Sequence, residues 1–257
     1  MNCYELVSRI RPIELAELIK RIWNPKRVIT EGEGCRFAVD PLTNFGRRLL
    51  TDGQYEPDMT AAMIGLLREG DTFIDAGANE GWFSVIAARA VGSSGLAIAI
   101  EPQERCWSAI HRNFSINRML NYRLIPYALG DCEGEIEMTL YPSLNNEASS
   151  LVSQRRSRHF ARQKTQLIRL DSVVNALGIA FVKLLKIDCE GYELNLLRGG
   201  ESLLAKGIVD HVLVEIHPAQ LAALGQREGE LTDYLESFGY RTSKAGSIIV
   251  WSRGRRN

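Results

Sequence analysis

The feature that most constrains the fold is an alternation of short apolar segments with amphipathic ones, which begins at Asp71 and continues to the C-terminus. The apolar segments have the length of buried strands, and the segments between them have the spacing of helices. Such an alternation predicts a parallel, doubly wound sheet with helices on both faces. Five strands of this sheet are expected at 72–77, 95–102, 122–129, 184–191 and 209–218.

The last part of the chain departs from the alternation. Residues 240–254 have the pattern of two strands joined by a tight turn. With the five earlier strands they predict a seven-stranded sheet that is mostly parallel and holds one antiparallel strand. Between the fourth and fifth strands we expect a helix over 193–207, and after the fifth strand another over 229–239.

The N-terminal region has a different organisation. Residues 12–23 have helical spacing, residues 36–57 are rich in glycine and proline and are expected to be loops, and residues 58–70 predict a helix that ends at Gly70. We therefore expect residues 1–60 to form an accessory cap with helical content. The remainder, residues 61–257, is expected to form one domain.

Residues 131–170 are an insertion between the third and fourth core strands. Its flanks, 135–141 and 165–170, have strand-like patterns and predict an inserted hairpin. Between Ser149 and Leu170 there is no acidic residue, but there are six basic ones: Arg155, Arg156, Arg158, Arg162, Lys164 and Arg169. This stretch is either a solvated loop or a contact surface for an anionic ligand. Because long irregular insertions often cover active sites, we expect a lid that becomes ordered with its ligand.

Charge and cysteine content exclude several classes of protein. Lys plus Arg equals Asp plus Glu at 31 each among 257 residues, which argues against a general nucleic-acid binder. The five cysteines are scattered and never spaced as C-x-x-C, so neither a disulfide framework nor a zinc knuckle is expected. The sequence shows no apolar signal segment and no uninterrupted apolar run of ~18 residues. A cytoplasmic location without a transmembrane segment is the expectation.

The strongest functional motif is Asp75-Ala76-Gly77-Ala78-Asn79-Glu80-Gly81, which ends the first strand and opens a helix. In doubly wound sheets, ligands bind at this edge of the sheet. The glycines are four residues apart, unlike the G-x-G-x-x-G turn that admits a pyrophosphate. The alternative is an ordinary turn in which Asn79 caps the helix.

Two acids in this region favour a cationic nucleoside as the ligand. Asp75 would repel a phosphate but attract a positive charge. Glu101 closes the second strand, just before Pro102, where an acid can accept hydrogen bonds from ribose hydroxyls. A positively charged nucleoside without phosphate describes S-adenosylmethionine.

A second motif, Lys186-Ile187-Asp188-Cys189-Glu190-Gly191-Tyr192-Glu193, ends the fourth strand. Asp188 is expected to point into the cofactor cleft as a base or ligand. Glu193 stands at a helix start, where an acid is either a capping residue or functional.

The fifth strand ends in Glu215-Ile216-His217-Pro218, and strand alternation places Glu215 and His217 on one face. His217 is either structural or part of the same centre as Asp188. Asp188, Glu190 and His217 could also hold a divalent metal, although their spacing matches no fixed metal motif.

The segments YEPDMT, DAGANEGWFS, EPQ, ALGD, SSL, LLKIDCEGYELNLLRGG and VEIH occur in an order that resembles the FkbM family of methyltransferases. The resemblance spans about residues 53–220. It implies a Rossmann-like class I fold that uses S-adenosylmethionine to methylate a hydroxyl of a sugar, glycolipid, polyketide or similar acceptor. By motif, the cofactor residues would be Asp75, Gly77, Ala78, Asn79, Gly81, Ser84, Glu101 and Pro102, with Asp131 near the adenine.

The resemblance also implies that Asp188 and Glu190 lie at the centre of methyl transfer. Since an alcohol is a poor nucleophile until its proton begins to leave, Asp188 or His217 is expected to act as general base, with Glu190 positioning the acceptor. Two other readings stay open: a non-catalytic nucleoside-binding protein, and an NAD-type oxidoreductase, which the absence of G-x-G-x-x-G disfavours.

Overall fold

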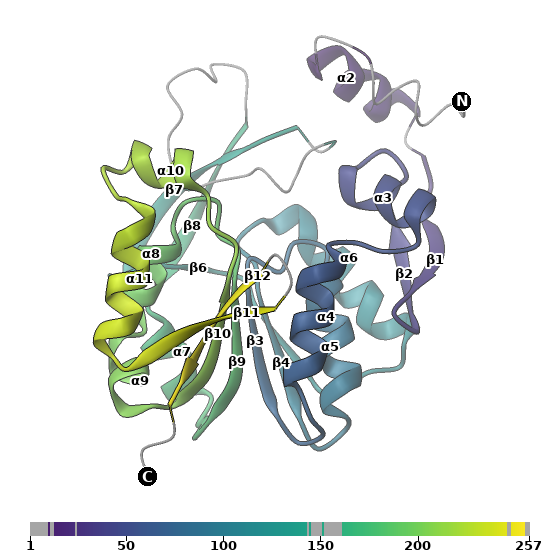
Figure 1. Cartoon of the computed structure of the whole chain (residues 1–257). Coiled ribbons are helices and arrows are strands. Elements are labelled where there is room, and N and C mark those ends of the chain that lie inside the picture. The colour runs from purple at the N-terminus through teal and green to yellow at the C-terminus, as the bar shows by residue number, and fades with distance from the viewer. Residues whose placement is uncertain are drawn as a thin grey trace.

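The computed structural model describes residues 10, 13–23, 25–142, 144, 151, 161–245 and 248–254 of the chain. Its centre is a seven-stranded sheet in the order β11-β12-β10-β9-β3-β4-β5 (Figure 1). The strands are β3 (Thr72–Ala76), β4 (Leu96–Ile100), β5 (Tyr122–Ile125), β9 (Val182–Ile187), β10 (Val209–Val214), β11 (Tyr240–Ala245) and β12 (Ile248–Arg253). Only β12 runs against its neighbours β10 and β11. The predicted doubly wound sheet with one antiparallel strand is confirmed.

Helices cover both faces of this sheet (Figure 1). On one side lie α4 (Pro57–Leu66), α5 (Trp82–Val91) and α6 (Glu104–Ile116). On the other lie α7 (Leu170–Ala176), α8 (Glu193–Gly199), α9 (Glu201–Lys206) and α11 (Glu228–Ser237), while α10 (Pro218–Ala223) follows β10.

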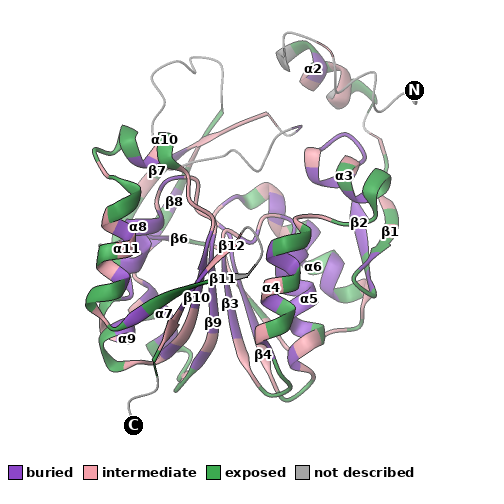
Figure 2. Ribbon diagram, viewed as in Figure 1, coloured by how far each residue is buried: buried purple, intermediate pink, exposed green. Residues whose placement is uncertain are grey.

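Strand alternation divides the apolar side chains between two cores. Phe73 packs with the α4–α6 side and Ile74 with the α7–α11 side, and Leu184 and Leu185 divide in the same way. Both faces of the sheet are thus apolar at its centre, which explains why β3, β4 and β9 are buried over most of their length, as Figure 2 shows.

The N-terminal region is more ordered than its composition predicts. The helix expected at 12–23 is α2 (Ile13–Trp23), but residues expected to be loops form the hairpin β1 (Val28–Gly32) and β2 (Cys35–Val39) and the helix α3 (Asn44–Asp52). Phe37 and Phe45 from these elements lie in the same buried cluster as Trp82 of α5. The hairpin could not be predicted from local sequence, because its apolar side chains are buried by packing against helices such as α5 and α6, which lie later in the chain.

Two expected elements are divided. The strand expected over 122–129 is β5 followed by β6 (Ala128–Leu129), which leaves the main sheet. Together with β7 (Gly134–Leu140) and β8 (Ala161–Ile168), β6 forms a small sheet in the order β6-β8-β7, so the inserted hairpin is present. The helix expected over 193–207 breaks between α8 and α9, where a side chain at Gly199 would collide with the carbonyl oxygen of Gly130.

Among the described residues, no helix has both the length and the apolar character needed to cross a membrane.

Candidate active site

A cleft opens at the carboxyl ends of β3, β4 and β9 and spans about 850 Å³, part of which is open to solvent. The predicted site residues that line it are Gly77, Ala78, Asn79, Glu101, Pro102, Asp188 and Glu190. The predicted residues Asp75, Gly81, Ser84, Asp131 and His217 are not part of its wall.

The glycine turn after β3 is held by the end of β4. The backbone amides of Gly77 and Ala78 donate to the carbonyl oxygen of Ile100, and the amide of Asn79 donates to Glu101 at 2.7 Å. Asn79 has a left-handed backbone, with φ of 48°. Because these three amides are already engaged, they cannot cradle a phosphate, which counts against a dinucleotide at this turn.

Glu101 follows β4 directly and is buried, with 2% of its surface exposed. Its two carboxylate oxygens accept hydrogen bonds from the backbone amides of Asn79 and Gln103. Burial raises the pKa of Glu101 to about 7, although those amides favour the ionised form. A carboxylate in this position can accept a hydrogen bond from a hydroxyl group of a ligand in the cleft.

The role of Gly77 differs from the sequence expectation that it makes room for a ligand. Its φ is 83°, and a Cβ there would lie 1.8 Å from the carbonyl oxygen of Asp188. In turn, the amide of Asp188 donates to the carbonyl of Ala76. The absence of a side chain at Gly77 therefore lets the ends of β3 and β9 meet, and this places Asp188 beside the glycine turn.

Asp75 has different neighbours from those that the sequence suggests. Its Oδ2 accepts a hydrogen bond from Ser84 at 2.6 Å, and its Oδ1 lies 3.3 Å from Nζ of Lys186. Both Asp75 and Lys186 are almost fully buried. The negative charge of Asp75 is thus directed at a lysine and not at the cleft.

Sequence reasoning passed over Lys186, which lines the cleft. Its Nζ also lies 3.4 Å from Asp188 and 4.7 Å from the centre of the Phe83 ring. Burial opposes the charged form, but Asp75 and Asp188 outweigh burial and raise the pKa of Lys186 above its ordinary value. The signal in the sequence was a lysine between the apolar residues Leu185 and Ile187 near a strand end, since a buried lysine requires a partner.

The walls of the cleft are apolar and aromatic. Tyr127, Leu129 and Met138 lie on the side of the small sheet, and Met138 comes from the inserted hairpin. Phe45 and Tyr55 come from the N-terminal region, and their rings meet edge to face at 5.1 Å. Regions outside the alternating core therefore complete the cleft.

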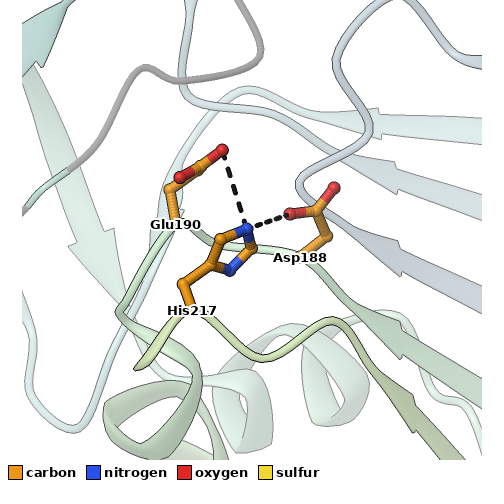
Figure 3. Close-up of side chains that lie close together, drawn as sticks. All are labelled: Asp188, Glu190 and His217. Carbon is orange, nitrogen blue, oxygen red and sulfur yellow. Dashed lines mark ion pairs between the residues drawn. The ribbon is translucent and has the colours of Figure 1, made fainter. Parts of the chain in front are cut away.

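Asp188, Glu190 and His217 meet at one point, as Figure 3 shows. Nε2 of His217 lies 3.8 Å from Oδ1 of Asp188 and 3.7 Å from Oε1 of Glu190. The strands end earlier than expected, at Ile187 and Val214, so these side chains stand on the turns beyond β9 and β10. Glu190 has a left-handed backbone, with φ of 50°, a conformation that is often found at functional sites.

Glu193 contacts Nδ1 of His217, the ring nitrogen that does not face Asp188 and Glu190. Its Oε1 lies 2.9 Å from Nδ1 of His217 and accepts a hydrogen bond from the amide of Gly191. Burial disfavours the charged imidazole, but Glu193, Glu190 and Asp188 outweigh it and raise the pKa of His217 to about 9. Glu193 thus accepts a hydrogen bond from a backbone amide at the start of α8, as a capping acid does, and it also contacts His217.

Asp131 lies away from the cleft. Its Oδ2 accepts a hydrogen bond from Asn195 at 3.2 Å, and its carbonyl accepts one from Arg169. Two further basic residues of the insertion, Arg162 and Lys164, form exposed ion pairs with Glu137 and Glu135. Arg155, Arg156 and Arg158 lie outside the described residues, so the lid expected there is described only in its second part, where residues 161–168 form β8.

The chain is similar in sequence to two fungal methyltransferases. It is 25% identical over 181 residues to methyltransferase sdnD of Sordaria araneosa, a match that covers 60% of this chain and 66% of the relative. It is 27% identical over 163 residues to Methyltransferase 1 of Beauveria bassiana, covering 57% and 65%. The matches thus span slightly less than two thirds of these relatives. A solved SAM-dependent methyltransferase from Aquifex aeolicus is similar at 15% identity, covering 80% of this chain and 90% of that one with a TM-score of 0.41.

The family model described as the methyltransferase FkbM domain matches residues 75–242, which include the glycine turn, Glu101 and the cluster around Asp188. The match covers more than half of the chain, and the mostly parallel seven-stranded sheet with one antiparallel strand is the sheet of a class I methyltransferase fold. The chain belongs to the FkbM methyltransferase family.

Proposed function

We propose that this chain is an S-adenosylmethionine-dependent methyltransferase that methylates a hydroxyl oxygen of a small-molecule or glycan acceptor, such as a sugar, glycolipid or polyketide. One observation carries the proposal: a single cleft has the glycine turn and Glu101 in its wall together with Asp188 and Glu190. A nucleoside-binding half and an acid–base half in one enclosure are what transfer from a nucleoside cofactor to an alcohol requires.

The residues present fit the cofactor. Glu101 would hold the ribose, and the apolar side chains Leu129 and Met138 would lie against the adenine. The aromatic rings of Phe45 and Tyr55 offer faces that favour a cation. When bound, S-adenosylmethionine supplies a methyl group on a positively charged sulfur.

Asp188 is the base in this proposal. Its carboxylate lines the cleft, so an acceptor hydroxyl can reach it and pass its proton to a carboxylate oxygen. His217 is not part of the cleft wall, so an acceptor in the cleft meets Asp188 before it could reach the imidazole. His217 therefore positions Asp188 and Glu190, and Glu190 orients the acceptor.

The test combines cofactor binding with turnover. Calorimetry should detect S-adenosylmethionine binding to the wild type and no binding of NAD. A panel of sugars, glycolipids and polyketides should yield S-adenosylhomocysteine release with at least one acceptor. With that acceptor, Asp188→Asn should lower the rate by ~10²–10⁴ and leave cofactor affinity nearly unchanged.

Asp210→Asn is the matched control, because Asp210 pairs with Lys183 on β9 away from the cleft. It should keep the wild-type rate. Cofactor binding without turnover on any acceptor would favour the non-catalytic reading. A wild-type rate for Asp188→Asn would instead remove Asp188 as the base and leave His217 as the candidate.

A further inference from the structure

Figure 3 shows Nε2 of His217 directed toward the carboxylates of both Asp188 and Glu190. One ligand atom from each of Asp188, Glu190 and His217 lies within 4.8 Å of the other two. The contacts of His217 Nε2 with the two carboxylates, at 3.7 and 3.8 Å, are longer than hydrogen bonds. The three groups therefore face a shared space and are not bonded directly to one another.

We propose that Asp188, Glu190 and His217 bind one divalent metal ion, and that this ion takes an acceptor with two adjacent oxygens. Two carboxylate oxygens and one imidazole nitrogen form a mixed donor set that suits Mn²⁺ and related first-row ions. The donors come from the turns after two neighbouring parallel strands, so the sheet itself holds them together.

The separations are close to those that an ion requires. Metal–ligand bonds of about 2.0–2.2 Å place ligand atoms about 3–3.5 Å apart in octahedral or tetrahedral geometry. The observed 3.7 and 3.8 Å from His217 exceed this range by a few tenths of an ångström, and the carboxylate ligand atoms of Asp188 and Glu190 lie within 4.8 Å of each other. Small rotations of the Asp188 and Glu190 side chains would close the difference.

The surroundings also have the form of a metal site. Histidine ligands commonly donate their second ring N–H to a carboxylate, which fixes the nitrogen that faces the metal. Glu193 provides this carboxylate at 2.9 Å from Nδ1 of His217, and its second oxygen, Oε2, is buried without a hydrogen-bond partner. Gln220 donates to Oε2 of Glu190 at 3.0 Å, which orients Oε1 toward His217.

The ligand positions left open would face the cleft, because Asp188 and Glu190 line it and His217 lies behind them. An acceptor with a vicinal diol or an α-hydroxy acid could occupy two such positions at once. This part of the inference rests on the proposed function. With the ion bound, Asp188 serves as a metal ligand. Removing the ion with EDTA should then abolish turnover, whereas a base that acts without metal would keep its activity.

The experiment titrates Mn²⁺ alone into metal-free protein, followed by calorimetry and by the loss of the free-ion paramagnetic resonance signal. We expect one ion per chain. His217→Ala and, as an independent second variant, Glu190→Gln should each weaken binding at least ~10-fold, the usual cost of losing part of a metal site. His211→Ala is the matched control, since His211 lies 3.3 Å from Asp210 on β10 away from the cleft. It should bind Mn²⁺ as the wild type does.

A second arm adds catechol, a rigid vicinal diol, and resorcinol, its 1,3-isomer. Catechol should bind only when Mn²⁺ is present, and resorcinol should not bind. Absent Mn²⁺ binding at millimolar concentration, or equal effects of His217→Ala and His211→Ala, would overturn the metal site. Catechol binding of equal affinity with and without Mn²⁺ would overturn the proposal that the ion takes an acceptor with two adjacent oxygens. If the protein binds no Mn²⁺ but still binds S-adenosylmethionine and turns over in the presence of EDTA, the proposed function stands without the metal.

Discussion

Nζ of Lys186 lies 3.3 Å from Oδ1 of Asp75, and both side chains are at most 1% exposed. The pair joins the carboxyl-terminal ends of β9 and β3 at the cleft, whose wall includes Lys186. An ion pair removed from water in this way depends on both partners, because either charge alone would be buried without compensation.

Lys186→Met should therefore lower the free energy of unfolding by ~3–5 kcal/mol, the usual cost of breaking a buried pair on one side. Denaturant unfolding measures it. Lys183→Met provides the control on the same strand: Lys183 pairs with Asp210 at 2.6 Å but both are partly exposed, so the cost should be ~0–1 kcal/mol.

Adding Asp75→Asn to Lys186→Met should recover part of the loss, because the buried carboxylate of Asp75 is then no longer left without its lysine. Asp75→Asn alone should also destabilise the fold, because it removes one carboxylate from the buried lysine. Strictly additive losses in the double variant would argue against the pair.

Glu101 should make cofactor binding dependent on pH. Its pKa is about 7 in the folded chain, against an ordinary value of 4.5, so the folded state holds the extra proton between these values. Its contribution to the free energy of unfolding thus falls as the pH rises from 4.5 to about 7 and is constant above that. Affinity for S-adenosylmethionine should move in the opposite direction, rising up to a pH of about 7, since the ionised carboxylate accepts hydroxyl hydrogen bonds.

Calorimetry across pH 5.5–8.5, a range of about 1.5 units on either side of that pKa, measures this change. Glu101→Gln should bind more weakly and lose the rise in affinity. Glu190 and Glu215 also have pKa values of about 7, so a rise that persists in Glu101→Gln would assign the effect to them.

Glu193 should act through His217. Glu193→Ala removes the acceptor of the His217 Nδ1 hydrogen bond and should lower kcat ~10–100-fold while leaving the Kd of S-adenosylmethionine unchanged. Glu193→Gln keeps an acceptor oxygen and should restore much of the rate. Glu201→Ala, at an exposed acid in the first turn of α9, is the control. A lower Tm with unchanged kcat in Glu193→Ala would mean that Glu193 is structural only.

Gly77→Ala tests the contact that places Asp188. Its Cβ would meet the carbonyl oxygen of Asp188, whereas Gly225 has a similar φ, 72°, with open space around it. Gly225→Ala therefore reports the backbone cost alone. We expect Gly77→Ala to lose at least about 2 kcal/mol more than Gly225→Ala in thermal or denaturant unfolding, since overpacking adds to the backbone strain. Equal losses would mean that the chain relaxes around the new methyl group.

The sequence alone determined the architecture of the core. Strands that are apolar on both faces and helices that are apolar on one face allow few arrangements, and a parallel sheet with helices on each side satisfies them all. The same pattern placed Gly77, Glu101 and Asp188 at one edge of the sheet, because the carboxyl ends of parallel strands lie together.

Only the tertiary structure decided which side chains face the cleft and which face one another. Asp75 and Asp188 look alike in the sequence, as acids beside strand ends. Lys186 of β9 lies against both, but of the two acids only Asp188 lines the cleft. Likewise, Glu193 became the partner of His217 only when α8 and the turn after β10 were brought together. These pairings depend on contacts between residues far apart in the chain, and local periodicity carries no information about such contacts.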